Sequence, residues 1–176
     1  AVTNSNILVS SDAGITWQSV GPVGRWRDIE FKPDNPNVIY AAKQSSGGSS
    51  VYRSNDGGAN WNIIDSGMSG SRYRPLICVT PANPNVVYAL FSASDYSFHG
   101  LYKSSDAGDT WAMQSDSPNI LGRDTDGTST GGQSWYDLSL GVAPNNENLI
   151  YVGGINLWKS NDGGESWDVD GSSGNG

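Results

Sequence analysis

An eight-residue motif occurs four times in this sequence and restricts the possible fold more than any other feature. Each copy reads Ser-x-Asp-x-Gly-x-[Thr/Asn/Ser]-Trp, and successive aspartates are 44, 50 and 56 residues apart. Such a spacing is the length of a repeat unit built from four short strands and their turns. The copies are residues 10–17, 54–61, 104–111 and 160–167.

A second motif alternates with the first. It begins with proline, contains an Asn-rich turn and ends seven residues later in tyrosine, at residues 33–40, 81–88 and 144–151. Proline presets φ and asparagine tolerates left-handed φ, so this segment reverses the chain. Two signatures that alternate in fixed order over nearly the whole chain indicate a repeat protein.

Strand patterns fill the spaces between the two motifs. Apolar residues two apart precede each proline, as in Ile29 and Phe31 and in Ile77 and Val79, which predicts a strand with these side chains facing inward. Runs rich in β-branched and aromatic residues follow each turn. The first motif then reads as the hairpin between third and fourth strands. We therefore predict an all-β fold of four-stranded β-propeller blades over residues 1–170. Its parts are a half blade at 1–20, whole blades at 25–64, 73–114 and 135–169, and a Gly/Ser-rich tail or linker at 171–176.

Composition excludes several classes of protein. The net charge of −8 argues against nucleic acid as a partner, and no apolar run is long enough to span a membrane. The single Cys78 lies in an apolar run, which is typical of a buried, unreactive thiol. Few lysines and many Asn, Ser and Gly residues favour an exported protein of bacterial type, placed outside the cell or on its surface.

At the eight-residue motif the sequence resembles the Asp-box, or bacterial neuraminidase repeat, propellers. That group includes sialidases, the sortilin receptor propeller, xyloglucan-cleaving glucanases and exported bacterial repeat proteins. The resemblance implies that the Asp-box carboxylates are structural and lie away from any catalytic face. It also implies closure with six or more blades, so the remaining blades would come from the same or another chain. The four carboxylates are Asp12, Asp56, Asp106 and Asp162.

In a propeller, the loops that join second to third strands share one face with those that lead into the first strands, and this face usually carries function. Here the segments leading into the first strands combine aromatic and polar residues. Aromatic rings stack on sugars, while arginines bind hydroxyls or carboxylates, which predicts a groove for a glycan or an extracellular protein. Alternatively, the rings close the ends of the blades and the arginines pair with Asp28 or Asp65. The candidate ligand-binding residues are Trp26, Arg27, Tyr73, Arg74, Trp135 and Tyr136.

Three carboxylates on this face are candidate catalytic acids, namely Asp28, Asp95 and Asp137. Glycoside hydrolysis needs two carboxylates on opposite sides of the scissile bond, and nothing in the sequence pairs these three. In the xyloglucanase-like propellers the two acids come from separate propellers, so this chain would hold half of a site. Sialidase chemistry is disfavoured because only two of the three segments carry arginine and no Phe/Tyr-Arg-Ile-Pro motif precedes the first Asp box.

The insertion before the last blade contains Asp124 and Asp126 in an Asp-x-Asp-Gly sequence, which resembles part of a calcium loop. Further acidic positions of a full loop are missing, so an ordinary polar turn is the alternative, and no cofactor other than calcium is predicted. His99 is interpreted as a surface residue. We conclude that the sequence predicts an exported ligand-binding propeller, preferably for carbohydrate. Part of a glycoside hydrolase and a structural or assembly unit are the alternatives.

Overall fold

The computed structural model describes residues 1–170, and these residues form strands and turns only. The predicted tail, 171–176, lies outside the described residues. No segment in the described range is a helix that could cross a membrane. The strands are β1 Ile7–Val9, β2 Gln18–Val20, β3 Arg25–Lys32, β4 Asn35–Gln44, β5 Ser50–Ser54, β6 Asn62–Ile63, β7 Pro75–Val79, β8 Val87–Ser92, β9 Phe98–Ser104, β10 Ala112–Ser115, β11 Ser139–Ala143, β12 Asn146–Gly153, β13 Leu157–Ser160 and β14 Asp168–Val169.

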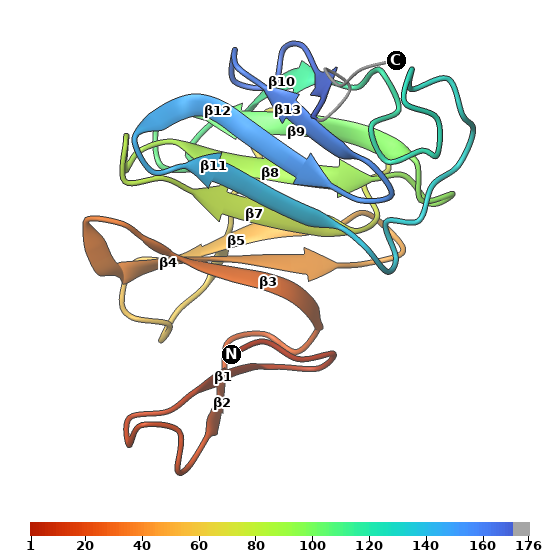
Figure 1. Ribbon diagram of the computed structural model, residues 1–176. Helices are drawn as coiled ribbons and strands as arrows, with labels where there is room; N and C mark the ends of the chain where they lie inside the picture. Colours follow the sequence, from red (N-terminus) through yellow and green to blue (C-terminus); the bar gives the residue numbers. More distant parts are fainter. Residues whose placement is uncertain (171–176) are drawn as a thin grey trace.

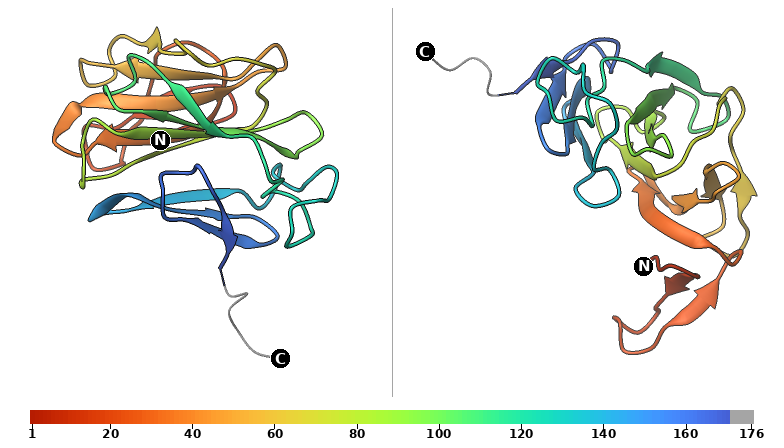
Figure 2. Two further views of the ribbon diagram at one scale, coloured as in Figure 1. Left: turned by 90° about the horizontal axis from the view of Figure 1, so that it is seen from above. Right: turned by 90° about the vertical axis from the view of Figure 1, so that its right-hand side faces the viewer.

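The strands form one two-stranded and three four-stranded sheets, and every pair of neighbours is antiparallel. Within each sheet the strands follow chain order, which is the meander of a propeller blade (Figure 1). The sheets fan out one after another from the N-terminal half blade to the C-terminal blade (Figure 2). First strands β3, β7 and β11 lie side by side. The all-β architecture of a half blade and three blades is therefore confirmed.

Apolar side chains between successive sheets form the core. One cluster joins the blade of β3–β6 to that of β7–β10, and a second joins the latter to the blade of β11–β14. Strand β8 belongs to both clusters and is buried along its whole length. Two tyrosines reinforce these interfaces, because Tyr40 donates to the Ala107 carbonyl at 3.1 Å and Tyr88 donates to the Glu147 carbonyl at 2.9 Å.

All four Asp boxes fold into the same hairpin turn. The Asp106 carboxylate accepts hydrogen bonds from the Ser104 hydroxyl (2.7 Å), the Thr110 backbone N–H (2.9 Å) and the Thr110 hydroxyl (2.6 Å). These bonds lower the pKa of Asp106 to about 2. At Asp162 burial is the largest effect and raises the pKa, but hydrogen bonds together lower it to about 2. These carboxylates thus stabilise their own turns, which is a structural role.

The four Asp-box tryptophans have different partners. Those of the first two copies donate to a carbonyl of their own turn, Trp17 to Gly14 and Trp61 to Gly58. The Trp111 indole N–H instead donates to the Ile64 carbonyl of the preceding blade, at 2.6 Å. Trp167 likewise reaches back a blade, to the Ser115 hydroxyl at 2.9 Å. The tryptophan therefore forms a hydrogen bond to the preceding blade only where that blade is complete, although Trp61 also packs in a cluster with Ile7 of the half blade.

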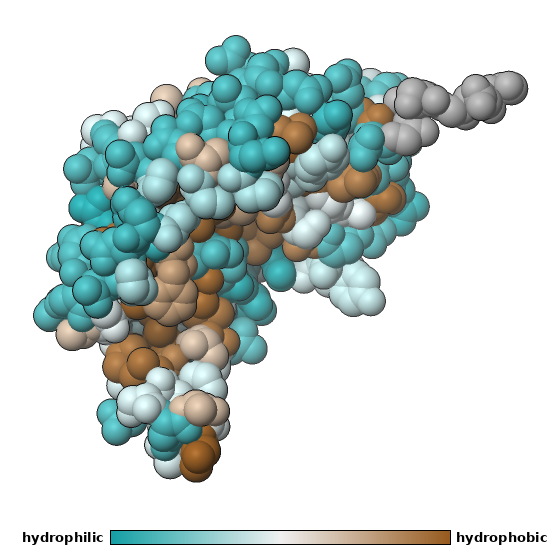
Figure 3. Space-filling model, turned by 60° about the vertical axis from the view of Figure 1, so that its left-hand side comes forward, coloured by the Kyte–Doolittle hydropathy of each residue, from teal (hydrophilic) through white to brown (hydrophobic). Residues whose placement is uncertain are grey.

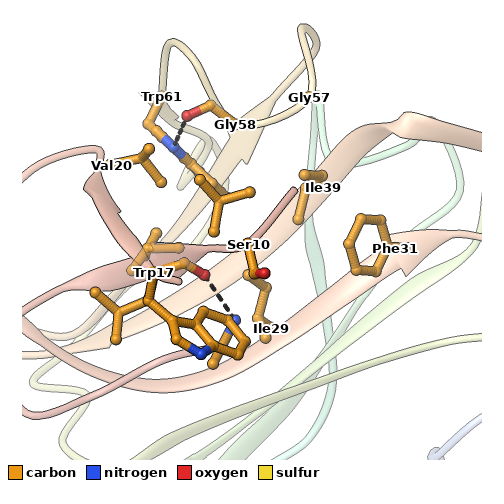
Figure 4. Close-up of a pocket in the computed structure, with 13 residues that line it drawn as sticks. Ser10, Trp17, Val20, Ile29, Phe31, Ile39, Gly57, Gly58 and Trp61 are labelled. Atoms are coloured by element: carbon orange, nitrogen blue, oxygen red, sulfur yellow. Dashed lines mark hydrogen bonds between the residues drawn. The ribbon is translucent and has the colours of Figure 1, made fainter. Parts of the chain in front are cut away.

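The half blade leaves apolar surface uncovered. Phe31 was expected to face inward like Val79, but it is 56% exposed and Trp17 is 50% exposed. Both line a groove of about 200 Å³ between β1–β2 and β3–β4, which we call the half-blade groove. Figure 4 shows Phe31, Ile39 and Trp17 around it, and Figure 3 shows apolar surface in the lower part of the molecule. Among residues 1–170 the sheet next to β3–β6 on this side has only two strands, which explains the exposure of Phe31.

Strand limits agree closely with the repeats except in the last blade. The blade was predicted to begin at residue 135, whereas its first strand, β11, begins at Ser139. Residues 134–136 form a turn in which the Tyr136 N–H donates to the Gln133 carbonyl. This turn presents Trp135 at the rim of the blade, where it meets the preceding blades.

Candidate functional site

Loops from successive blades converge at the end of the sheets opposite the Asp boxes. The Asp boxes pack on the Asn-rich turns of their own blades, as when the Ala107 N–H donates to the Asn85 carbonyl. At the other end, the β4–β5 loop is tied to the segment before β7, because the Ser49 N–H donates to the Arg72 carbonyl. The chain thereby brings together residues that are far apart in sequence.

A pocket of about 200 Å³ lies at this end, and we call it the arginine–aromatic pocket. Strands β3 and β4 supply two arginines and a glutamine, and the segment before β7 supplies a tyrosine and an arginine. Two loops, 93–97 and 133–138, supply the remaining rings. The lining residues are Arg25, Arg27, Gln44, Tyr73, Arg74, Tyr96 and Trp135. Four of the six predicted ligand-binding residues therefore line one pocket.

Two of the three guanidinium groups are held in place. Arg27 Nε donates to Gln44 Oε1 at 2.6 Å, and Arg74 Nη1 donates to the Trp135 carbonyl at 2.9 Å. Burial lowers the pKa of Arg27 and that of Arg74, and the positive charge of Arg25 lowers both further. Like charges held together in this way favour an anion between them.

Four aromatic rings form a row beside the arginines. Ring centroids are 5.8 Å apart for Tyr73 and Tyr96, 6.3 Å for Tyr96 and Trp135, and 5.6 Å for Trp135 and Tyr136. The planes are tilted by 67°, 63° and 48°, so the row is curved and not a flat platform. Trp135 is 53% and Tyr136 75% exposed, which leaves ring faces open to solvent.

Arg25, Gln44 and Tyr96 line the pocket but were not among the predicted ligand-binding residues, and Tyr96 is the one with an unusual backbone conformation. Its φ of 68° lies in the left-handed region, which is costly for a bulky residue and is often found at functional sites. Its backbone N–H donates to the Ala93 carbonyl, and its ring bridges Tyr73 and Trp135. The sequence feature that could have identified Tyr96 is its position in the loop of residues 92–100, which lies on the face predicted to carry function.

Trp26 does not face the pocket. It is 2% exposed, and its indole N–H donates to the Pro22 carbonyl at 3.1 Å. Its ring packs against Tyr52 and Trp61. Trp26 therefore belongs to the core between the half blade and the next blade, and the prediction that it contacts ligand is wrong for lack of accessible surface.

The three candidate catalytic acids lie in different environments. Asp28 accepts backbone hydrogen bonds from Ile29 at 2.9 Å and from Ile77 of the next blade at 3.0 Å. Burial raises the pKa of Asp28, while these two hydrogen bonds and the charge of Arg74 oppose the rise. Its role here is to join two inner strands, β3 and β7.

Asp95 and Asp137 are not joined to Asp28 in one site. Asp95 accepts hydrogen bonds from the backbone N–H and hydroxyl of Ser97, which lower its pKa. It lines a separate polar pocket with Arg123 and Gln133. Asp137 follows the 134–136 turn, where its backbone N–H donates to the Gln133 carbonyl.

The remaining polar candidates are dispersed. Asp126 accepts hydrogen bonds from the N–H and hydroxyl of Thr128, the geometry of a polar turn, and Asp124 lies exposed in the same loop. Within residues 1–170 no three His, Cys, Asp or Glu side chains are grouped as metal ligands. The Nε2 atom of His99 lies 3.3 Å from the Ser69 carbonyl oxygen. Burial raises the pKa of the Cys78 thiol to about 11.

The sequence profile of the Sortilin-Vps10 family, described as "Sortilin, neurotensin receptor 3", matches residues 5–126, which is more than half of the chain. The chain belongs to the Sortilin-Vps10 family. Most of the arginine–aromatic pocket lies within the matched range, and Trp135 lies outside it.

A curated relative extends the similarity over most of this Sortilin-Vps10 chain. It is a xyloglucanase of Hypocrea jecorina (strain QM6a), 29% identical over 172 residues, which is 89% of this chain and 19% of the relative. The chain thus spans about a fifth of that protein.

Solved structures share the fold. An ancestral GH74 enzyme superimposes with a TM-score of 0.68 at 18% identity, over 96% of this chain and 21% of the enzyme. The GH74 xyloglucanase of Xanthomonas campestris has a TM-score of 0.66 at 20% identity, over 92% of this chain and 26% of the enzyme. YCF48 bound to a D1 peptide has a TM-score of 0.59 at 19% identity, over 96% of this chain and 48% of YCF48. These likenesses place the Sortilin-Vps10 chain among Asp-box propellers.

Proposed function

We propose that this Sortilin-Vps10 chain binds an extracellular carbohydrate in its arginine–aromatic pocket. The observation that carries the proposal is the convergence of guanidinium groups and partly exposed aromatic rings from three blades on one pocket. Ring faces stack on the apolar faces of sugars, while guanidinium groups donate hydrogen bonds to sugar oxygens. The protein is exported, of bacterial type, and acts outside the cell or on its surface. An extracellular protein is the alternative partner, which the peptide bound to YCF48 supports.

Binding to oligosaccharides immobilised on a glycan array tests this proposal. The Trp135→Ala variant removes an exposed ring from the pocket, and we expect it to lose most of the array signal. Tyr151→Ala is the matched control, because Tyr151 is a partly exposed ring of strand β12 that lies outside the pocket. Equal signals from both variants and the unchanged chain, or no signal for any glycan, would refute a carbohydrate site at this position.

A second candidate is half of a glycoside hydrolase site that other blades complete. The similarity to a xyloglucanase favours it. In the described structure Asp95 is the candidate acid that lines an open pocket, whereas Asp28 is engaged between strands. Release of reducing ends from xyloglucan, abolished by Asp95→Asn, would support this candidate. Unchanged hydrolysis in that variant would exclude Asp95 from the catalytic role.

A third candidate is an assembly unit. The half-blade groove and the exposed Phe31 favour it, since apolar surface of this kind is normally covered by a neighbouring blade. Analytical ultracentrifugation of the chain tests it. A particle heavier than one 18.7 kDa chain supports assembly, and a monodisperse monomer contradicts it.

A further inference from the structure

The arginine–aromatic pocket is a cationic site on an acidic protein. The chain has a net charge of −8 and only ten Lys and Arg residues, yet three of those ten line this single pocket. Among the described residues that line it, none is acidic. The pocket would therefore attract an anion even though the protein as a whole repels one.

The arginines hold donor capacity that the described protein does not use. Arg74 Nε is buried and has no hydrogen-bond partner among the described residues. The Arg25 side chain is exposed and forms no hydrogen bond or ion pair within residues 1–170. A buried donor without a partner is costly, so it is normally satisfied by water, an ion or a ligand.

The groups around these donors restrict the ligand. A planar guanidinium matches a planar carboxylate with two parallel hydrogen bonds. The curved row from Tyr73 through Tyr96 to Trp135 forms one wall of the pocket and continues outward to the exposed ring of Tyr136. A ligand with a carboxylate beside a ring of apolar C–H faces satisfies both features, whereas a neutral glycan leaves the free donors of Arg25 and Arg74 without a charged acceptor.

We infer that the pocket recognises the carboxylate of a uronic acid residue, so that the carbohydrate ligand is an acidic oligosaccharide. This inference rests on the proposed function, and it narrows the ligand from carbohydrate in general to uronate-bearing chains. Arg25 and Arg74 bind the carboxylate, Arg27 is held by Gln44 and adds positive charge, and the aromatic row contacts the sugar ring. The relatives reported above are named xyloglucanases, after xyloglucan and not after a uronate-bearing chain. The inferred ligand therefore separates this chain from them.

Isothermal titration calorimetry with matched ligands tests the inference. The probes are trisaccharides of galacturonate, glucuronate and mannuronate, and the methyl ester of each, which keeps the sugar but removes the charge. We expect at least one free acid to bind about 10- to 100-fold more tightly than its ester. The preference should shrink as salt rises, because the contact is partly electrostatic.

Two variants and one control test whether the preference for the free acid arises in the arginine–aromatic pocket. Arg74→Gln removes the buried donor, and Arg25→Gln removes an exposed guanidinium whose loss should leave folding intact. Each is expected to weaken binding of the free acid about 10-fold or more while changing binding of the ester little. Lys159→Gln is the control, since Lys159 is a partly exposed cation of β13 that lies outside both the arginine–aromatic pocket and the Asp95 pocket, and it should leave the affinity within about twofold.

The possible outcomes separate recognition of the carboxylate from binding of carbohydrate in general. Equal binding of acid and ester, unchanged in Arg25→Gln, would overturn the carboxylate inference and leave carbohydrate binding in place. Absence of binding by every acid, every ester and every neutral glycan would overturn both. Binding of a peptide with a free C-terminal carboxylate, but of no sugar, would overturn the uronate assignment and favour the extracellular-protein alternative.

Discussion

Replacing Trp111 by alanine should destabilise the fold far more than replacing Trp17, although both occupy the same position of the same motif. Trp111 is 5% exposed in the core between two blades, and its indole N–H donates to the Ile64 carbonyl at 2.6 Å. Trp17 is 50% exposed at the half-blade groove and donates within its own turn.

The expected magnitudes follow from buried area. A tryptophan buries about 150–250 Å² when covered, which at about 25 cal/mol per Å² corresponds to about 4–6 kcal/mol. Relaxation of the site reduces this, so Trp111→Ala should lower the free energy of unfolding by about 3–5 kcal/mol. Trp17 buries about half as much and borders open groove, so Trp17→Ala should cost about 1–2 kcal/mol.

Urea denaturation followed by far-ultraviolet circular dichroism measures both variants without relying on tryptophan fluorescence. The Trp111→Phe variant separates the lost hydrogen bond from the lost volume, and its cost should lie between zero and that of Trp111→Ala. The slopes against urea must agree among the variants for the midpoints to be compared. Equal costs for Trp17→Ala and Trp111→Ala would refute the claim that inter-blade burial, and not the motif, sets the contribution of this residue.

Three further predictions concern the backbone and the carboxylates. Gly67→Ala should cost more than about 2 kcal/mol in denaturation experiments, because φ is +93° and a Cβ would lie 2.2 Å from the Trp111 carbonyl oxygen. Gly141→Ala, where the Cβ site is open and φ is ordinary, should be neutral or slightly stabilising. Asp28→Ala should cost about 1–3 kcal/mol, because the Ile77 N–H loses its acceptor. It should not weaken binding of an acidic ligand in titration calorimetry, because the Asp28 carboxylate opposes the positive charge of Arg74. The Asp-box carboxylates have pKa values lowered from 3.8 to about 2, so their contribution is present above about pH 4 and is lost toward pH 2. The melting temperature should fall over that range, and an unchanged value would contradict the prediction.

The candidate site was only partly predictable from sequence. Tyr73, Arg74 and Trp135 were selected because aromatic and polar residues precede the first strands, and they do meet in one pocket. Trp26 fits the same pattern, but its ring turns into the core. Residues two apart on a strand share one face, yet only the packing of the neighbouring blade decides whether that face is covered. A pattern of residue types therefore identifies the end of the blade and not the side chains that line a pocket there.

Tyr96 and Arg25 show a second reason why the pocket could not be fully predicted from sequence. Tyr96 reaches the pocket because its loop adopts a left-handed φ that no composition rule assigns to tyrosine. Arg25 acquires importance because it lies near Arg27 and Arg74, and Arg74 belongs to another blade. Such proximity depends on how the blades fan around the inner strands.

Local chemistry and tertiary packing thus determine different parts of this protein. The turns of the Asp box and of the Asn-rich motif depend on residues at most seven positions apart, so strand order, blade length and the hairpins follow from sequence alone. The pocket, the exposed Phe31 and the inter-blade bonds of Trp111 and Trp167 depend on contacts between different blades, and the two bonds join residues 47 and 52 positions apart. These contacts are decided by which blades are adjacent, because burial and charge are properties of the assembled sheets and not of any one segment.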